Sequence, residues 1–199
     1  ELQDFLSGRS LPLYDMMTYH LGWRDERGAL GEALGKKLRP IFCLLACRAA
    51  GGNPEAILPA ASALELLHNF SLIHDDIEDE TSLRHHRPTV WKLWGLPQGV
   101  NTGDAMLALA HMALYELEAR GMAAFKVLQA AQILDETCLE LCEGQYLDMS
   151  FDSRRDIGVD DYVTMVSKKT GALFEASFKM GALLGSAGTF WVEPLGWIA

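Results

Sequence analysis

The stretch of sequence that decides the fold is PAASALELLHNFSLIHDDIED, residues 59–79. Its apolar residues recur with the spacing of an α-helix, and Pro59 suits the first turn of one, where a backbone N–H would have no partner. Residues 60–73 are predominantly apolar, so we expect this helix to be buried along much of its length. The helix would then deliver the carboxylates of Asp75, Asp76 and Asp79 into a cavity.

The acidic run at the end of this helix has the composition of a cation site. Asp75 and Asp79 lie one turn apart and share a face, with Asp76 beside them. Like charges at this spacing destabilise a helix unless a positive charge lies between them. A hard divalent cation suits such oxygen ligands, and Mg²⁺ commonly bridges one or two carboxylates to substrate phosphates. The alternative is an acidic helix end in water, because charge runs usually face solvent.

The rest of the chain is also dominated by helical periodicity, which predicts an all-α protein. Further helices are expected at 38–50, 103–119, 123–147 and 159–184, the last of them interrupted by Gly171. The connecting segments are a turn-rich stretch at 80–89 and a loop at 152–158, and 185–199 show no amphipathic pattern. Because no repeat or linker divides the sequence, we expect a single domain over 1–199.

Composition excludes several classes of function. The formal net charge is −10 and the pI is near 5.0, and a field of this sign repels nucleic acids and anionic membranes. The apolar run at 105–115 is about half the length that spans a bilayer, so we expect no integral membrane segment. The first residues do not read as a secretory signal.

The cysteines form two pairs, each with one helical turn between its members, within apolar sequence. This spacing is typical of core packing and does not match the two-residue gap of common zinc modules. The pairs are Cys43 with Cys47 and Cys138 with Cys142. Reduced thiols of this kind predict a cytoplasmic protein.

Basic and polar side chains occur in patches on both sides of the acidic run. In a chain this acidic, such patches indicate a phosphate-binding site, although each alone is also typical of a solvated surface. His68 lies seven residues before Asp75 and so on nearly the same helical face, while a lone histidine is more often part of a core. The other members of the patches are Lys36, Arg39, Arg84, Arg87, Gln145, Asp148, Lys168, Lys169 and Thr170.

The order of these motifs resembles the trans-isoprenyl diphosphate synthases, also called the polyprenyl synthetase family. The resemblance covers roughly 35–170 and rests on GKxxRP at 35–40, ELLH with SLIHDDIED at 65–79, RxxRPT at 84–89, NxGD at 101–104, GQxxD at 144–148 and KT at 169–170. It implies an isoprenoid-synthase-type helical bundle with a central substrate cavity, usually a homodimer. Such an enzyme joins an allylic diphosphate to isopentenyl diphosphate with Mg²⁺ as cofactor.

The resemblance also implies roles for individual residues. Asp75, Asp76 and Asp79 would hold Mg²⁺ on the allylic diphosphate and, with Lys169, form the catalytic set. The expected ligands of the allylic diphosphate are Arg84, Gln145, Lys169 and Thr170, and those of isopentenyl diphosphate are Lys36, Arg39 and His68.

Product length is expected to depend on the residues just before the acidic run. By the resemblance, Phe70 and Ser71 floor the cavity and limit the product to about C15 to C20, with geranylgeranyl diphosphate favoured over farnesyl diphosphate. The alternative for Phe70 is ordinary core packing, the commoner role of a helical phenylalanine.

Two departures from the family pattern leave other functions open. Arg84 is followed by His85 and His86 where the family usually has paired arginines, so one contact to isopentenyl diphosphate is absent or replaced by an imidazole. The family's second aspartate-rich motif is not found in 171–199, which predicts a chain that is incomplete at its C-terminus, divergent or impaired. The alternatives are a class I terpene cyclase, a noncatalytic partner subunit of a complete synthase and, more weakly, an HD-type phosphohydrolase.

Overall fold

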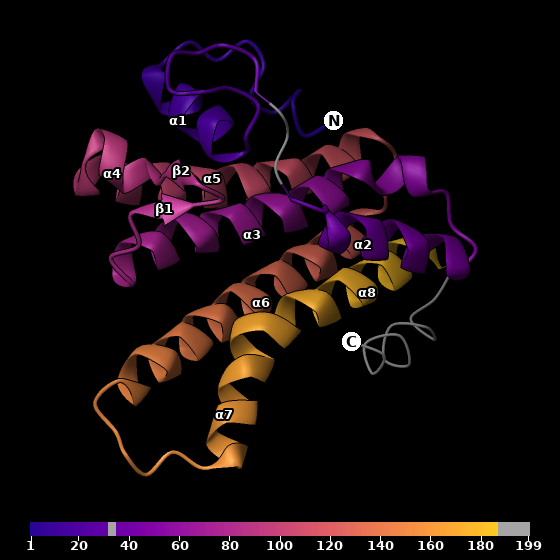
Figure 1. Ribbon diagram of the computed structural model, residues 1–199. Helices are drawn as coiled ribbons and strands as arrows, with labels where there is room; N and C mark the ends of the chain where they lie inside the picture. Colours follow the sequence, from indigo (N-terminus) through magenta and orange to yellow (C-terminus); the bar gives the residue numbers. More distant parts are fainter. Residues whose placement is uncertain (32–34, 187–199) are drawn as a thin grey trace.

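The chain folds into packed layers of α-helices (Figure 1). The computed structural model describes residues 1–31 and 35–186. In chain order the elements are α1 (Pro12–His20), α2 (Leu38–Ala49), the 3₁₀ turn η1 (Pro54–Ile57), α3 (Leu58–Glu78), β1 (Leu83–Arg84), β2 (Arg87–Pro88), α4 (Val90–Trp94), α5 (Leu96–Ala119), α6 (Ala124–Phe151), α7 (Val159–Val166), the π-helical turn η2 (Ser167–Gly171) and α8 (Ala172–Gly185).

Helix α3 is the core of the bundle. It packs along α5 and also contacts α2, α6 and α8, so that Leu64, Leu66 and Leu67 are fully buried. Burying one such side chain contributes about 1.5–3 kcal/mol relative to leaving it exposed. The segment Pro54–Glu78 is long and apolar enough to cross a bilayer, but 67% of its most apolar window is buried inside the fold. The apolar residues of this segment are therefore those of a helix in the core of the fold.

Glycines allow the helices to approach one another closely. A methyl group at Gly99 would lie 2.8 Å from Ile77 Cδ1, and one at Gly103 would overlap the imidazole of His74, so α5 needs both glycines to lie against α3. On α8, Gly185 faces the backbone of Cys47 on α2 in the same way. The site-bearing end of α3 therefore packs closely against α5.

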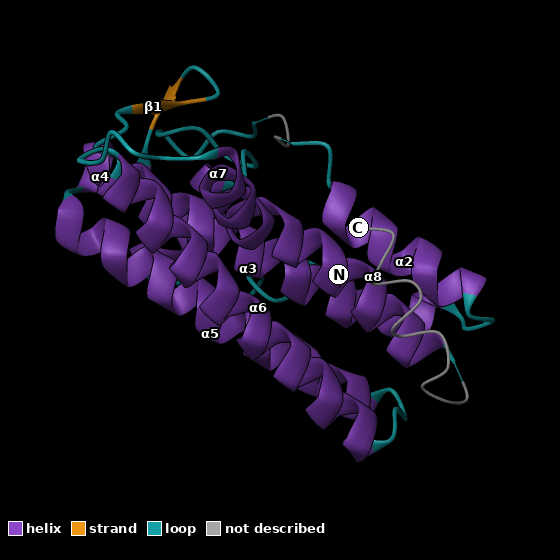
Figure 2. Cartoon of the chain, turned by 90° about the horizontal axis from the view of Figure 1, so that it is seen from below, coloured by secondary structure: helices purple, strands orange, loops and turns teal. Residues whose placement is uncertain are grey.

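A short hairpin follows α3 and lies at the α4 end of the bundle (Figure 2). Strands β1 and β2 pair with Arg84 opposite Arg87, and the two residues between them are His85 and His86. Both histidines have positive φ, 51° and 63°, as the tight two-residue hairpin turn demands of its central residues. Contacts with α1 hold this strained turn: the Tyr19 hydroxyl donates to the Pro88 carbonyl at 2.7 Å.

The all-α prediction is confirmed, with some element boundaries shifted. The helices expected at 38–50 and 59–79 agree with α2 and α3 to within one residue. Helix α5 begins at Leu96 and not at 103, and α6 continues to Phe151 and not to 147. Helices α1 and α4 and the hairpin were not predicted, and most of 185–199 lies outside the described residues.

The core-packing prediction for the cysteines is confirmed at Cys43, Cys47 and Cys138. Cys43 and Cys47 are buried between α2 and α8, and burial raises the pKa of both thiols. Cys138 is partly buried and packs against the core, whereas Cys142 is exposed, so core packing was the wrong expectation for Cys142. All four are free thiols.

Candidate active site

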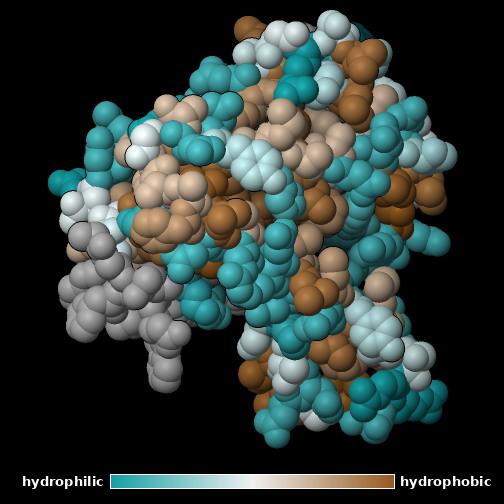
Figure 3. Space-filling view, turned by 180° about the vertical axis from the view of Figure 1, so that it is seen from behind, coloured by the Kyte–Doolittle hydropathy of each residue, from teal (hydrophilic) through white to brown (hydrophobic). Residues whose placement is uncertain are grey.

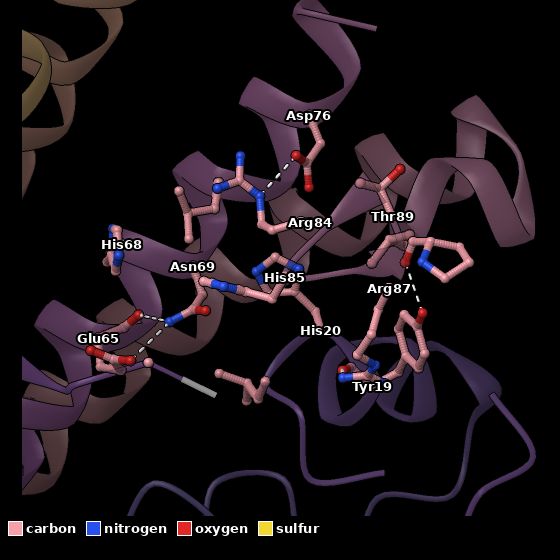
Figure 4. Close-up of a pocket in the computed structure, with 15 residues that line it drawn as sticks. Tyr19, His20, Glu65, His68, Asn69, Asp76, Arg84, His85, Arg87 and Thr89 are labelled. Atoms are coloured by element: carbon pink, nitrogen blue, oxygen red, sulfur yellow. Dashed lines mark hydrogen bonds and ion pairs between the residues drawn. The ribbon is translucent and has the colours of Figure 1, made fainter. Parts of the chain in front are cut away.

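The acidic end of α3 lies between two hollows. The first, which we call the α6 cavity, is bounded by α3, α6, η2 and the start of α8, and its volume is about 890 Å³ including its open mouth. The second, the hairpin pocket, lies between α1, α3 and the hairpin and measures about 580 Å³ on the same basis (Figure 4). Asp75 lines the α6 cavity and Asp76 lines the hairpin pocket, while His68 and Leu72 border both.

In the α6 cavity, Asp75 is bound by a lysine from the π-helical turn. Lys169 Nζ lies 3.1 Å from Asp75 Oδ1 and also pairs with Asp148 on α6. Burial alone would lower the pKa of Lys169, but the two carboxylates raise it above its usual value. The ammonium therefore stays charged, and Thr170 lines the same cavity beside it.

In the hairpin pocket, Asp76 is held by the first arginine of the hairpin. Arg84 Nε lies 2.8 Å from Asp76 Oδ1 (Figure 4). The Nη2 atom of Arg84 lies 3.4 Å from Asp75 Oδ2. Asp76 is only 2% exposed, and burial raises the pKa of its carboxyl, an effect that repulsion from Asp75 strengthens and Arg84 opposes. One guanidinium thus bridges two neighbouring carboxylates.

Asp79 lies at the end of α3, where an amide from α6 approaches it. Gln145 Nε2 is 3.4 Å from Asp79 Oδ1, and the Gln145 Oε1 atom is buried without a hydrogen-bond partner. Burial and repulsion from Asp75 raise the pKa of Asp79. An unpaired buried oxygen beside a crowded carboxylate is unfavourable unless a cation or donor completes the group.

The acidic cluster fits a cation that is shared with a phosphate better than one held by protein alone. Within 1–31 and 35–186, no three His, Cys, Asp or Glu side chains are placed to hold a metal ion together. The donors are nevertheless hard oxygens, and burial together with their mutual repulsion, which raise the pKa of Asp76 and Asp79, favours positive charge beside them. Arg84 and Lys169 supply that charge in this structure.

Arg39 and His68 meet at the wall between the two hollows. Arg39 Nη1 lies 3.1 Å from His68 Nε2, its guanidinium lies 4.8 Å from the Phe174 ring centre, and its Nε is buried without a partner. Burial and the neighbouring Arg39 lower the pKa of His68 to about 3, so the imidazole is neutral. Arg39 therefore keeps an unused donor near the α6 cavity, which it lines.

The lysines of the 35–40 segment are placed differently from one another. Lys36 is exposed and lines neither hollow, whereas Lys37 points to α3 and pairs with the buried Glu65 at 2.8 Å. His85 lines the hairpin pocket, in which a neutral His20 also lies, because burial lowers the pKa of His20 to about 3. Sequence reasoning did not single out Lys37, Glu65 or His20.

Phe70 and Ser71 both line the α6 cavity below the carboxylates. Phe70 is 8% exposed and meets the His74 ring edge-on, with 4.7 Å between ring centres. The Ser71 hydroxyl donates to the His68 carbonyl at 2.8 Å, so it faces back along α3. Phe70 is therefore the bulkier of the two groups bordering the cavity.

Known proteins with the same sequence features are prenyl diphosphate synthases. A family model described as polyprenyl synthetase matches residues 29–197. The chain is 43% identical over 173 residues to the (2E,6E)-farnesyl diphosphate synthase of Mycobacterium tuberculosis, covering 86% of this chain and 47% of that protein. It is also 43% identical to the geranylgeranyl diphosphate synthase of Methanosarcina mazei, over 83% of this chain and 50% of that one.

Solved structures agree with the sequence comparison. The polyprenyl synthetase of Streptomyces coelicolor superposes with a TM-score of 0.90 at 35% identity, covering 98% of this chain and 56% of that one. The chain spans about half the length of the curated relatives that it matches. It belongs to the polyprenyl synthetase family, with the isoprenoid-synthase fold.

Proposed function

We propose that this chain forms the substrate-binding half of a short-chain prenyltransferase, which joins an allylic diphosphate to isopentenyl diphosphate. The observation that carries the proposal is the pair of hollows on either side of α3, each bordered by cationic groups and one of the aspartates. A class I terpene cyclase has a single diphosphate to bind and has no need for the hairpin pocket. The relatives with similar sequences are named as synthases of farnesyl and geranylgeranyl diphosphate.

In the proposed reaction, the α6 cavity binds the allylic diphosphate. Lys169, Thr170 and Gln145 would contact its phosphates from α6 and η2, and Arg84 would do so from the hairpin. Mg²⁺ bound by Asp75, Asp76 and Asp79 would offset the negative charge of the diphosphate. These residues suit a departing diphosphate, whose charge increases as the allylic C–O bond breaks and the bonding electrons leave with oxygen.

The apolar wall of the cavity would protect the allylic cation. Phe70, Leu141 and Leu173 are buried apolar residues that line the cavity, and they would exclude water from the hydrocarbon chain. The π electrons of the isopentenyl double bond then form the new C–C bond, and a proton leaves the neighbouring carbon for the released diphosphate. No side-chain nucleophile takes part.

Isopentenyl diphosphate would bind near the hairpin pocket, with Arg39 and His68 at the wall between the two sites. Lys36 would complete the set from the loop before α2. His85 replaces the second arginine of the family pattern at the rim of this pocket. With Phe70 as the floor of the cavity, the product would be between farnesyl and geranylgeranyl diphosphate in length, with geranylgeranyl diphosphate favoured.

The enzyme is further proposed to be a cytoplasmic homodimer. Large apolar side chains stand exposed along α5 and α6, including Met112, Tyr115, Phe125, Leu128 and Leu139, and a second copy would cover them. The α6–α7 end also projects from the body of the molecule, with apolar residues among polar ones (Figure 3). Sedimentation at micromolar concentration should give twice the mass of one chain, and a monomer would contradict the dimer.

Incorporation of labelled isopentenyl diphosphate into an extractable product tests the prenyltransferase itself. The chain is incubated with Mg²⁺ and geranyl or farnesyl diphosphate, and the product is resolved by reversed-phase chromatography. Asp75→Ala and Asp79→Ala should each lower incorporation at least about a hundredfold, because each removes charge stabilisation of the leaving group. The control is Asp152→Ala, an exposed carboxylate in the α6–α7 loop. Equal turnover in both acidic-run variants would refute the assignment.

A further inference from the structure

A buried glutamate in the wall of the hairpin pocket is paired with a partly exposed lysine. Glu65 on α3 is 5% exposed, and Lys37 Nζ lies 2.8 Å from its Oε1 atom. Asn69 lies one turn further along α3, and its Nδ2 donates to the main-chain carbonyl of Glu65 at 2.7 Å and to the side-chain Oε1 of Glu65 at 3.2 Å (Figure 4). A carboxylate buried to this degree requires such partners, since an unpaired buried charge is strongly destabilising.

Lys37 occupies a backbone conformation that its side chain does not favour. Its φ and ψ are 53° and 37°, in the left-handed region, and it is the residue that precedes α2. A non-glycine residue in this region costs roughly 1–2 kcal/mol, so it persists only where surrounding contacts determine it. The ion pair with Glu65 is the contact from the Lys37 side chain to another element. It therefore fixes where α2 begins relative to α3.

The position of that helix start decides where Arg39 lies. Arg39 is two residues beyond Lys37, in the first turn of α2, and reaches His68 at 3.1 Å. His68 in turn is three residues after Glu65 on α3. The Lys37–Glu65 pair and the Arg39–His68 pair thus join the same two helices at adjacent points, and the first holds the second in register.

We propose that Glu65 and Lys37 are positioning residues for the isopentenyl diphosphate site. This inference rests on the proposed function. The pair sets the start of α2 and with it Arg39 and Lys36, while Lys37 also cancels a carboxylate that would otherwise repel a diphosphate in the pocket. Lys37 is not itself a ligand of the diphosphate, because its ammonium is already committed to Glu65.

The two roles of Lys37, positioning and direct ligation, predict different orders of affinity. If it positions, Glu65→Gln weakens binding of isopentenyl diphosphate by about tenfold through loss of register. Lys37→Met weakens it by about a hundredfold, because the buried Glu65 charge is left unpaired beside the diphosphate. The double variant then recovers to the affinity of Glu65→Gln. If Lys37 is a ligand, Glu65→Gln frees it and binding is equal or tighter, and the double variant stays as weak as Lys37→Met.

Isothermal titration with isopentenyl diphosphate measures these affinities. The α6 cavity is first filled with Mg²⁺ and a non-ionising thio-analogue of farnesyl diphosphate, so that heat reports the second site. The affinity for the analogue and the circular dichroism of each variant should stay near those of the unaltered chain. Lys37→Arg, which keeps the cation on a partly exposed residue, should bind within about threefold of the unaltered chain. Lys92→Met, an exposed lysine on α4, is the matched control and should show no change.

The outcomes separate the inference from the proposed function. An unaltered chain that binds no isopentenyl diphosphate overturns both. If the unaltered chain binds isopentenyl diphosphate and Glu65→Gln binds it equally well or more tightly, only the positioning role is overturned. If Glu65→Gln does not fold, the double variant decides: an affinity well above that of Lys37→Met would support the inference, and an affinity as weak as that of Lys37→Met would overturn it.

Discussion

Gly144 is the point at which α6 touches the π-helical turn that carries Lys169. A methyl group at Gly144 would lie 2.7 Å from Lys169 Cα and nearer still to its backbone nitrogen. The obstacle is main chain and not a flexible side chain, so Gly144→Ala can be accommodated only if α6 and η2 move apart. Overpacking of this kind typically costs about 1–3 kcal/mol.

The displacement should reach the site directly. An ordinary carbon–carbon contact needs about 3.5–4.0 Å, so the backbone at Lys169 must shift by roughly 1 Å. The ion pair of Lys169 with Asp75, now 3.1 Å, would then lengthen beyond the range of a salt bridge. We expect the melting temperature to fall by about 2–12 °C, at 2–4 °C per kcal/mol for a chain of this size. Affinity for the Mg²⁺ complex of the farnesyl thio-analogue should fall by about tenfold to a hundredfold.

Circular dichroism melts and analogue titration provide the two measurements. The matched control is Gly171→Ala in the same π-helical turn, where an added methyl would meet only the Ser167 Cβ at 4.0 Å. That variant should keep its affinity, and its melting temperature should stay the same or rise by a few degrees, because alanine is the better helix former. A Gly144→Ala protein that melts and binds as the unaltered chain does would show that the close approach of α6 and η2 does not position Lys169.

Three further changes test other parts of the structure. Phe70→Ala should shift the products of an active form of the enzyme to longer chains and lower the free energy of unfolding by about 3–5 kcal/mol. The control is Phe125→Ala at an exposed position, which should leave the product length measured by chromatography unchanged. Unaltered products from a folded Phe70→Ala variant would show that Phe70 is not the floor of the cavity. His86→Gly should raise the free energy of unfolding by about 1 kcal/mol in denaturant melts, because φ is 63° there, while His86→Ala should not. His111 Nε2 lies 2.7 Å from Asp135, and although burial opposes protonation, the hydrogen bonds to Asp135 and the Leu107 carbonyl raise the pKa of His111 above 6.5. Because its pKa is raised, protonated His111 stabilises the fold fully below pH 6.5, and this stabilisation is lost as the pH rises through the pKa of the folded state. Asp135→Asn should reduce that loss in thermal melts measured across this pH range. A pH profile of stability that Asp135→Asn leaves unchanged would contradict the role of the pair.

The long helices could be predicted because their signals are local. Pro40 near the start and Gly51 past the end bound α2, and the apolar spacing of α3 needs no partner to be recognised. The start of α5 was missed because residues 96–102 include Gly99, a poor helix former in isolation. In the fold this glycine is what permits α5 to lie against Ile77. Tertiary packing therefore overrode the local preference.

The site was predicted in part. Which residues share a face of a helix follows from their spacing in the sequence, but the direction in which a loop residue points does not. The spacing of His68 and Asp75 indicates a shared face, and both line the α6 cavity. The left-handed conformation of Lys37 has no sequence signal, yet it decides that Lys37 and not Lys36 meets α3. The pairing of Glu65 with a residue 28 positions away is likewise visible only once the helices are packed.

The π-helical turn η2 changes which neighbours in the sequence can share a direction. In a regular α-helix, consecutive side chains diverge by about 100°, so two adjacent residues rarely face one small cavity. Lys169, Thr170 and Leu173 nevertheless all border the α6 cavity, and the wider turn at Ser167–Gly171 contains the first two of them. Deleting one residue from this turn would restore a continuous α-helix and rotate everything beyond it by one residue step. The ammonium that pairs with Asp75 and the hydroxyl that lines the cavity would then come from different positions in the chain, so the length of this segment is itself a constraint on the site.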